Sequence, residues 1–197
     1  MTSRSEGGSP VGTRVVMHLD LDYFFAQCEE KRRPELHDKP VVVCVYSGRT
    51  PDSGAVSTAN YVARRMGVKS GIPIIQAKRL LEKAADAVFL PVDHDFYESM
   101  SARVMSILRH RCEKFEQGGI DEAYMEVTGR VQGDFDRAAA EAAEVKREVH
   151  EREGLICSIG IGPNKLIAKI ASDFQKPDGL TVVKPEGVQS FLADMDV

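Results

Sequence analysis

Four carboxylates in two short apolar segments have the residue types and spacing of a metal-binding site. Asp20 and Asp22 end an apolar run in which alternate residues point to a core, so the two acids share the opposite face. Asp121 and Glu122 lie within a second apolar run. Carboxylates among apolar residues are costly unless they bind something positive, and several together recruit a hard cation such as Mg²⁺. If the two runs are neighbouring strands, the pattern predicts two ions that clamp an in-line phosphoryl displacement.

Each acidic pair also has a purely structural explanation. Asp20 and Asp22 could cap a helix that follows the first run, and Asp121 and Glu122 could mark the solvated end of a strand. One such pair alone favours the structural explanation, whereas a second pair inside an apolar run favours the metal site. The prediction therefore depends on the two strands being neighbours.

A basic segment between residues 61 and 83 is the first candidate for an anion site. Its six basic residues stand against one acid, although the whole chain has a net charge of -4. Thr58, Tyr61 and Arg64 recur at a spacing that puts them on roughly one face of a helix. A hydroxyl, a phenol and a guanidinium on one face suit the oxygens of a triphosphate. The alternative is a solvated helix face with Thr58 or Ser57 as its cap.

Two weaker signals accompany the basic segment. In GIGPNK (160–165) a strand leads into a helix through glycines, and Lys165 in the first turn adds a point charge to the helix dipole. It is not a Walker loop, because Leu166 follows the lysine. Tyr23, Phe24 and Phe25 cannot all face the core of one helix. One of these aromatic rings could lie over the sugar of a bound nucleotide, and the others are ordinary core residues.

The elements that must position these residues follow from apolar periodicity and capping residues. Strands and helices alternate irregularly, which indicates the α+β class. Asp22 is expected to cap the first helix, and Asp134 and Gly154 are expected to bound the alanine-rich one. The expected strands lie over 15–22, 39–46, 86–92, 118–129, 155–162 and 179–183, and the expected helices over 23–33, 58–66, 74–83, 96–114, 135–153, 164–175 and 186–194.

Composition excludes several other classes. With 197 residues, 43% of them hydrophobic and 28% charged, the chain has the make-up of a folded protein, and no apolar run is long enough to span a membrane. The net charge of -4 argues against binding nucleic acid by bulk charge alone. The start of the chain, 1–13, lacks the apolar core of a signal peptide and is expected to be a flexible tail. The four cysteines are widely spaced, which indicates neither zinc nor disulfides and favours a cytoplasmic location.

Four blocks of sequence carry a resemblance to a known family. They are HLDLDYFFAQCEE, PVVVCVYSGRTPDSGAVSTANYVARRMGVKSGIPI, GIDEAYMEV and GIGPNKLIAKIASDFQKPDGL. In this order they resemble the signature blocks of Y-family translesion DNA polymerases, in particular the DNA polymerase IV branch and its archaeal members. The similarity runs from about residue 14 to the end of the chain.

The resemblance implies a ferredoxin-like polymerase palm with a small inserted α/β fingers subdomain. The palm would comprise 14–23 and 90–172, the fingers 24–89, and residues 173–197 would begin a truncated thumb. The chain is then expected to be a catalytic-core fragment that lacks most of the thumb and the C-terminal DNA-gripping domain. Its active site would be complete and its grip on DNA poor.

The resemblance also implies roles for individual residues. Asp22 matches an acid of the family that is not a primary metal ligand. Phe25 matches the steric gate, an aromatic ring that blocks a ribose 2′-OH. The remaining matches are catalytic carboxylates at Asp20, Asp121 and Glu122, a further metal ligand in the carbonyl of Leu21, and triphosphate-binding residues at Thr58, Tyr61, Arg64 and Lys165.

The implied reaction is attack of a primer 3′-OH on the α-phosphate of a deoxynucleoside triphosphate (dNTP), with release of pyrophosphate. Two Mg²⁺ ions would serve it, with Mn²⁺ as a substitute. The family implies low-fidelity translesion synthesis in DNA repair and damage tolerance. The implied partners are primer-template DNA, the dNTP and, for the full-length protein, a sliding clamp. A monomer without membrane contact is expected.

Two other functions compete with this interpretation. An apolar strand followed by Asp-Leu-Asp resembles the nucleophile motif of haloacid-dehalogenase-type phosphatases. That motif requires a small residue and then Thr or Ser after the second acid, whereas Tyr23 and Phe24 follow here. The second alternative is a catalytically inactive polymerase-like binding subunit, against which the intact Asp20, Asp121 and Glu122 argue.

Overall fold

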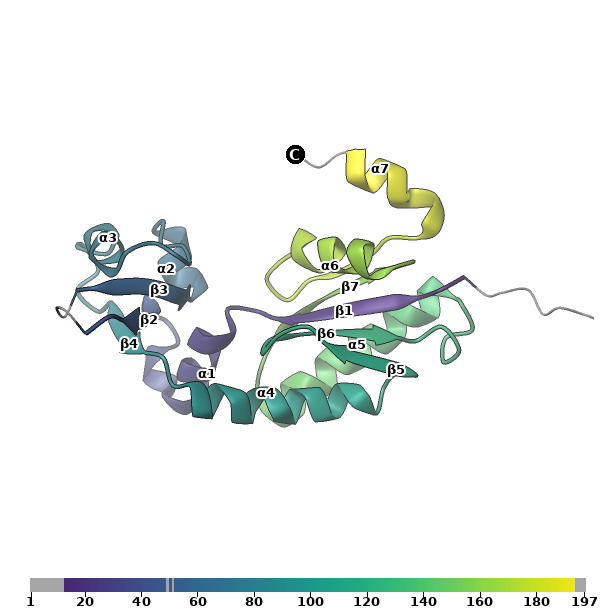
Figure 1. Cartoon of the computed structure of the whole chain (residues 1–197), viewed down its shortest axis with the longest axis horizontal. Coiled ribbons are helices and arrows are strands. Elements are labelled where there is room, and N and C mark those ends of the chain that lie inside the picture. Colours follow the sequence, from purple (N-terminus) through teal and green to yellow (C-terminus); the bar gives the residue numbers. More distant parts are fainter. Residues whose placement is uncertain (1–12, 49, 51, 194–197) are drawn as a thin grey trace, which may run out of the picture.

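The computed structural model describes residues 13–48, 50 and 52–193, and they form two β-sheets at opposite ends of an elongated molecule (Figure 1). The larger sheet has five strands in the order β5-β6-β1-β7-β8. Its strands are antiparallel except for β7 and β8, which run parallel. The five strands are β1 (Val16–Leu21), β5 (Lys114–Gln117), β6 (Glu122–Glu126), β7 (Cys157–Gly162) and β8 (Leu180–Val182).

The central position of β1 explains why its residues are so apolar. It pairs with β6 on one side and β7 on the other, so nearly all of its side chains are buried. The register sets Asp20 opposite Glu122. The two acidic segments are therefore neighbouring strands, as the metal-site prediction required.

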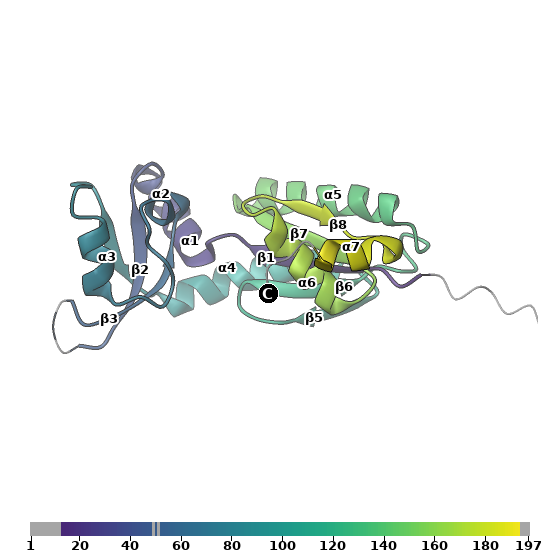
Figure 2. The ribbon, with the colours of Figure 1, turned by 90° about the horizontal axis from the view of Figure 1, so that it is seen from above.

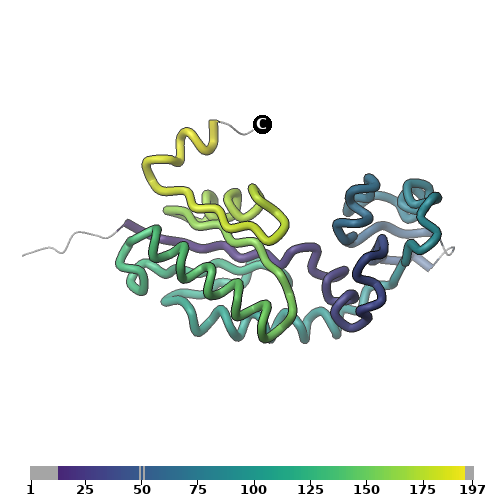
Figure 3. The backbone as a smooth tube through the Cα atoms, turned by 180° about the vertical axis from the view of Figure 1, so that it is seen from behind, coloured from purple at the N-terminus to yellow at the C-terminus, as the bar shows by residue number. Residues whose placement is uncertain are grey.

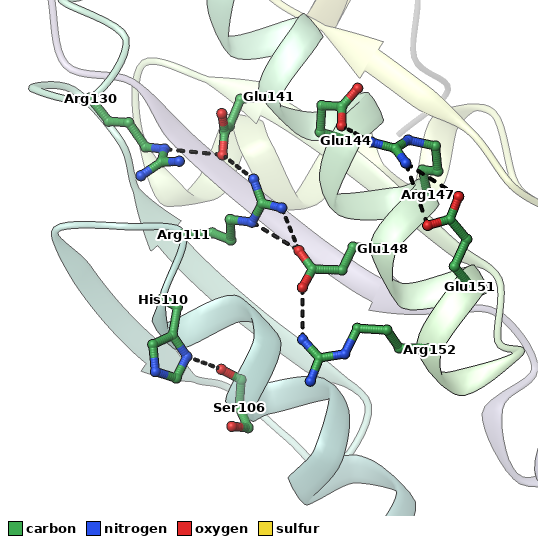
Figure 4. Close-up of polar contacts among 10 residues, drawn as sticks. All are labelled: Ser106, His110, Arg111, Arg130, Glu141, Glu144, Arg147, Glu148, Glu151 and Arg152. Carbon is green, nitrogen blue, oxygen red and sulfur yellow. Dashed lines mark hydrogen bonds and ion pairs between the residues drawn. The ribbon is translucent and has the colours of Figure 1, made fainter.

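Helices cover both faces of this sheet (Figure 3). Helices α4 (His94–Arg109) and α5 (Phe135–Glu153) lie on one face, and α6 (Lys165–Phe174) lies on the other. Alternate residues of β1, Met17 and Leu19, are fully buried in the main core. An Arg–Glu network ties α5 to the segment after α4 and to the connection between β6 and α5; it comprises Arg111, Arg130, Glu141, Glu148 and Arg152 (Figure 4).

Two glycines let α6 approach β7 closely. A Cβ atom at Gly160 would lie 2.0 Å from the carbonyl oxygen of Ala168 and 2.2 Å from the backbone nitrogen of Ser172. At Gly162 the corresponding atom would lie 2.8 Å from a side-chain carbon of Ile167. No side chain fits in these gaps, so the helix rests directly on the strand backbone.

Gly160→Ala is therefore expected to destabilise the fold by about 3 kcal/mol, because the new methyl group must displace the backbone of α6. Urea unfolding monitored by circular dichroism measures this change. Gly187→Ala is the matched control, since a Cβ atom there meets nothing within 4 Å. A loss below about 1 kcal/mol for Gly160→Ala would contradict the close packing of α6 on β7.

The smaller sheet has three strands in the order β3-β2-β4 and a core of its own (Figure 2). Alternation along β2 serves two cores, because Val41 and Val43 face the main one and Val42 and Cys44 face the smaller one. Helix α1 (Phe24–Arg32) and the short η1 (Pro34–Leu36) link the two sheets. The other elements are β2 (Val41–Tyr46), β3 (Gly54–Ala59), β4 (Val88–Pro91), α2 (Tyr61–Arg65), α3 (Ile74–Leu80), η2 (Pro185–Gly187) and α7 (Val188–Ala193).

Two sequence-based predictions about the bounds of helices were wrong. The expected helix over 58–66 begins only at Tyr61 and is capped by Asn60, because Gly54–Ala59 pairs with β2 as strand β3. The expected helix over 96–114 ends at Arg109, since residues from Lys114 onward pair with β6 as strand β5. In both cases pairing with the neighbouring strand of a hairpin outweighs the local helical propensity.

The cap predicted for the first helix was also wrong, whereas the one for α5 is confirmed. Tyr23 is the N-cap of α1, with no side-chain hydrogen bond, and the Asp22 carboxylate binds other groups. Asp134 accepts hydrogen bonds from two backbone N–H groups of α5, and Gly154 ends that helix at a φ of 60°.

All four cysteines are free. Among the helices of the described part of the chain, none combines the length and the apolar character needed to cross a membrane.

Candidate active site

A cavity of about 240 Å³ collects most of the predicted site residues. Its walls come from the end of β1, the start of α1, the β3–α2 corner, the turn before β6 and the α6–β8 connection. The predicted residues that line it are Asp20, Leu21, Phe25, Thr58, Tyr61, Arg64 and Asp121, together with Tyr23, Phe24, Ser57, Ser70 and Lys176.

Two carboxylates face the cavity, Asp20 from β1 and Asp121 from the turn that leads directly into the adjacent strand β6. The backbone N–H of Leu21 donates to the carbonyl of Asp121 at 2.9 Å, which holds the two segments in register. Burial raises the pKa of Asp20 to about 6, although an ammonium–carboxylate contact of 2.7 Å with Lys176 acts in the opposite direction. Burial also raises the pKa of Asp121. Both carboxylates are thus poorly hydrated, and a cation would stabilise their charged forms.

Glu122 adjoins the cavity without lining it. Its carboxylate is paired with Lys169 of α6, and Nε2 of the fully buried His18 lies 3.4 Å from the same oxygen. Burial alone would raise the pKa of Glu122, but the hydrogen bond and charge of Lys169 outweigh it and lower the pKa. Glu122 is therefore a charged carboxylate directly beside Asp121.

The oxygen donors of this site fit a hard cation. Among the described residues, no group of three or more His, Cys, Asp or Glu side chains is already arranged around a metal position. Asp20 and Glu122 are instead each neutralised by a lysine ammonium, from Lys176 and Lys169. Desolvated carboxylates and a backbone carbonyl are the ligands that Mg²⁺ prefers.

The hydroxyl, phenol and guanidinium predicted to share one helix face do come together. Thr58 lies in β3, however, and only Tyr61 and Arg64 belong to α2. Nε of Arg64 donates to the carbonyl of Ala59 at 2.8 Å, and its Nη2 lies 3.4 Å from the Thr58 hydroxyl. The guanidinium carbon also lies 5.0 Å from the centre of the Tyr61 ring. The corner between strand and helix therefore aims all three groups into the cavity.

The lysine in the cavity is one that the sequence analysis did not select. Lys176, on the α6–β8 connection, contacts both Asp20 and Asp173 at 2.7 Å. Lys165 lies elsewhere. It pairs with the exposed Glu116 and lines a separate cavity of about 260 Å³ beside strands β1, β5 and β6. Lys176 stands in the KPDG stretch of the fourth sequence block, a turn signal that could have drawn attention to it.

Phe25 lines the cavity on the side of α1. Its ring stacks on that of Tyr97 from α4, with the ring centres 4.3 Å apart and an interplanar angle of 14°. The neighbouring Phe24 is almost fully buried in the main core. Of the two phenylalanines, Phe25 is therefore the half-buried one, held by its stacking on Tyr97 at the wall of the cavity.

Comparison with known proteins assigns the chain to a family. The family model described as impB/mucB/samB matches residues 19–173, which is well over half of the chain. The chain belongs to the impB/mucB/samB family. A DNA polymerase IV from Nitrosopumilus maritimus is 58% identical over 185 residues, and one from Metallosphaera sedula is 52% identical over 183 residues. These matches cover 94% and 93% of this chain but 51% of each relative, so the chain spans about half the length of these curated relatives.

Solved structures of family members confirm the fold. The insertion ternary complex of Dbh DNA polymerase superimposes with a TM-score of 0.87 at 46% identity, covering 93% of this chain and 52% of that chain. The DinB structure from Sulfolobus solfataricus gives 0.86 at 45% identity, with the same coverage of each chain. The expected α+β fold, a ferredoxin-like polymerase palm with a small inserted fingers subdomain, is confirmed. So is the resemblance to the DNA polymerase IV branch of the Y-family, which removes the basis for the phosphatase alternative.

Proposed function

We propose that this chain is the catalytic core of a template-directed DNA polymerase that transfers dNTPs to a primer 3′-OH. The observation that carries the proposal is the convergence of Asp20 and Asp121 with Arg64 and Lys176 on one cavity. In-line nucleotidyl transfer requires two kinds of group: carboxylates that would hold cations, and basic side chains that would bind phosphate. The family resemblance supports low-fidelity translesion synthesis in DNA repair as its use.

The two sheets correspond to the two subdomains of this core. We assign the palm to 14–23 and 90–172 and the fingers to 24–89, the bounds expected from the sequence, with two adjustments. Leu90 and Pro91 join the fingers because β4 pairs with β2, and β8 joins the palm because it pairs with β7, so the thumb expected over 173–197 would begin after β8. The carboxylates then belong to the palm, and Thr58, Tyr61 and Arg64 belong to the fingers. The bound nucleotide would lie between the two, in the cavity that both line.

The basic and hydroxyl groups would hold the triphosphate. Arg64 keeps one guanidinium edge on the carbonyl of Ala59, which orients the other edge toward the cavity. The Thr58 hydroxyl and the Tyr61 phenol supply neutral donors beside it. We assign the lysine of this set to Lys176 in place of Lys165, because Lys176 lines the cavity.

Asp20, Asp121, Glu122 and the carbonyl of Leu21 would hold Mg²⁺, two ions per site, with Mn²⁺ as a substitute. Bound there, the ions lower the pKa of the primer 3′-OH and neutralise the leaving phosphates. The protein residues orient the reactants. Asp20 and Asp121 would hold the cations at one side of the cavity, and the Phe25 ring would contact the sugar of the nucleotide at the other. In cation binding, Lys176 would leave Asp20 and turn to the phosphates.

The partners proposed for the whole protein follow from the relatives. Their structures include the insertion ternary and the post-insertion binary complexes of Dbh DNA polymerase. We infer that primer-template DNA and a dNTP bind here. A sliding clamp recruiting the full-length protein, and a monomeric state, complete the proposal.

Discrimination between deoxyribose and ribose tests the proposal. In the presence of Mg²⁺ the chain is expected to bind dATP more tightly than ATP, because the Phe25 ring occupies the space of a 2′-OH. Phe25→Ala is expected to reduce that preference by about tenfold, which is the usual discrimination that a steric contact of this size provides between two substrates. Isothermal titration calorimetry with both nucleotides measures the ratio.

Phe174→Ala provides the control, since that aromatic side chain is exposed on α6 and does not line the cavity. It should leave the dATP-to-ATP ratio unchanged. An unchanged ratio in Phe25→Ala would contradict the assignment of Phe25 as the gate.

A further inference from the structure

Asp22, the second acid of the Asp-Leu-Asp pattern, has no part in the cavity, yet it is almost completely buried at 1% exposure. Both of its carboxylate oxygens lie 3.0 Å from the hydroxyl of Ser158, which donates to them. One of them also accepts the backbone N–H of Asp178 at 2.8 Å. A buried carboxylate is retained only where such hydrogen bonds compensate for its lost hydration. Its partners therefore indicate what it does.

Those partners belong to, or hold, the connection between α6 and β8, residues 175–179. The Ser158 hydroxyl accepts the backbone N–H of Gly179 at 3.1 Å, so Asp22 and Ser158 together bind two successive N–H groups of the connection. Asp178 has a φ of 57°, a left-handed conformation that is unfavourable for a residue with a side chain. The hydrogen bond to Asp22 stabilises this conformation.

A second group fixes the same connection from the side of α5. Nζ of Lys146 contacts Oδ1 of Asp178 at 2.6 Å and the carbonyl of Gly179 at 3.2 Å. The C-terminal half of the connection is thus held by a buried anion on one side and a cation on the other. Its backbone has little freedom there.

Lys176 stands two residues before Asp178 on this connection and reaches Asp20 in the cavity. A lysine side chain is long and flexible, so the position of its ammonium depends on where its backbone is fixed. We propose that Asp22 is a positioning residue: it fixes the 175–179 connection so that Lys176 presents its ammonium to the triphosphate. The inference rests on the proposed function, in which Lys176 contacts the nucleotide.

A double-mutant cycle on dATP binding tests the inference directly. In the presence of Mg²⁺, Lys176→Ala is expected to weaken dATP binding by about tenfold, the typical loss of a charge-assisted hydrogen bond. Asp22→Ala is expected to weaken it by a similar factor. Because Asp22 acts through Lys176, Asp22→Ala should cause no further loss when Lys176 is already alanine.

The conservative variant separates position from charge. Asp22→Asn keeps an oxygen that can accept the N–H of Asp178, so its affinity for dATP should stay within about twofold of the unmodified chain. Hydrogen exchange of the Asp178 and Gly179 amides should accelerate in Asp22→Ala and stay slow in Asp22→Asn. Glu153→Gln is the control, since Glu153 is a buried carboxylate that binds Arg103 and does not contact the connection.

The outcomes distinguish this inference from the proposed function. If Lys176→Ala leaves dATP binding unchanged, the triphosphate role of Lys176 fails. Suppose instead that Lys176→Ala weakens dATP binding. The positioning role of Asp22 is then overturned by any of three results: Asp22→Ala leaves the affinity for dATP unchanged, its loss of affinity adds to that of Lys176→Ala, or Asp22→Asn loses as much affinity as Asp22→Ala. Should Asp22→Ala fail to fold, Ser158→Ala takes its place in the cycle, because it removes the hydroxyl that links Asp22 to Gly179.

Discussion

Nucleotidyl transfer by this chain is expected to fall about 10³-fold or more when Asp20 or Asp121 is replaced by asparagine, because stabilisation by a bound cation contributes several kcal/mol. The amide keeps the shape of each side chain and removes the negative charge. Both carboxylates are desolvated and face the cavity, so loss of either negative charge removes one of the groups that would bind the cation. Single-turnover extension of a primer by one nucleotide, at saturating DNA and Mg²⁺, measures the rate.

Glu126→Gln is the matched control for this experiment. Glu126 lies on β6 as Glu122 does, but it pairs with Arg14 and does not line the site cavity. Its replacement should leave the rate within about twofold of the unmodified chain. A rate within tenfold of the unmodified chain for Asp20→Asn and Asp121→Asn would exclude the carboxylates as cation ligands.

Glu29→Ala is expected to lower the free energy of unfolding by about 2–3 kcal/mol, because it removes a fully buried carboxylate together with the hydrogen bonds that it accepts from Arg32, Arg33 and Tyr97. The Glu29 carboxylate is fully buried in α1. It accepts hydrogen bonds from Nε of Arg32 at 2.9 Å and from the Tyr97 hydroxyl at 2.7 Å, and it also pairs with Arg33. Without Glu29, the buried Tyr97 hydroxyl loses the acceptor of its hydrogen bond. Urea unfolding at neutral pH measures the loss.

The pH dependence of the same variant gives an independent readout. Burial alone would raise the pKa of Glu29, but the hydrogen bonds from Arg33, Arg32 and Tyr97 outweigh it and lower the pKa. The stability that Glu29 contributes is therefore complete above its unfolded pKa of 4.5 and is lost as the pH falls through the lower folded pKa. The difference between Glu29→Ala and the unmodified chain should shrink in acid.

Glu144→Ala serves as the comparison for Glu29→Ala. Its carboxylate is exposed and pairs only with the exposed Arg147, so the expected loss is below about 1 kcal/mol. A loss of similar size for Glu29→Ala at neutral pH would contradict the structural role of the buried Glu29 carboxylate.

Local signals in the sequence were enough to find the carboxylates and several element ends. The Asp134 cap, the Gly154 end of α5 and the apolar strand before Asp20 each depend on residues close together in the chain. The adjacency of Asp20 and Glu122 could only be assumed, since strand pairing joins residues about a hundred positions apart. The structure supplies that pairing.

The errors arise where a residue's partner elsewhere in the fold, and not its own local pattern, decides the outcome. Gly54–Ala59 is rich in small residues and resembles a turn, yet it forms a strand because the edge of β2 is available to it. Lys165 has the local features of an anion site at a helix start, whereas Lys176 follows the helix in a plain turn. Lys176 reaches the cavity because Asp22 and Ser158, far away in the sequence, hold its connection. No local pattern contains that information.

Calorimetric titration of the chain with dATP, once with Mg²⁺ and once with EDTA, tests the cation-dependent nucleotide site most directly. The proposed site requires tight binding with Mg²⁺ and little binding in EDTA, and Asp121→Asn should abolish the difference between the two conditions. Equal affinity in Mg²⁺ and EDTA would show that Asp20 and Asp121 do not form a cation site for the nucleotide in this chain.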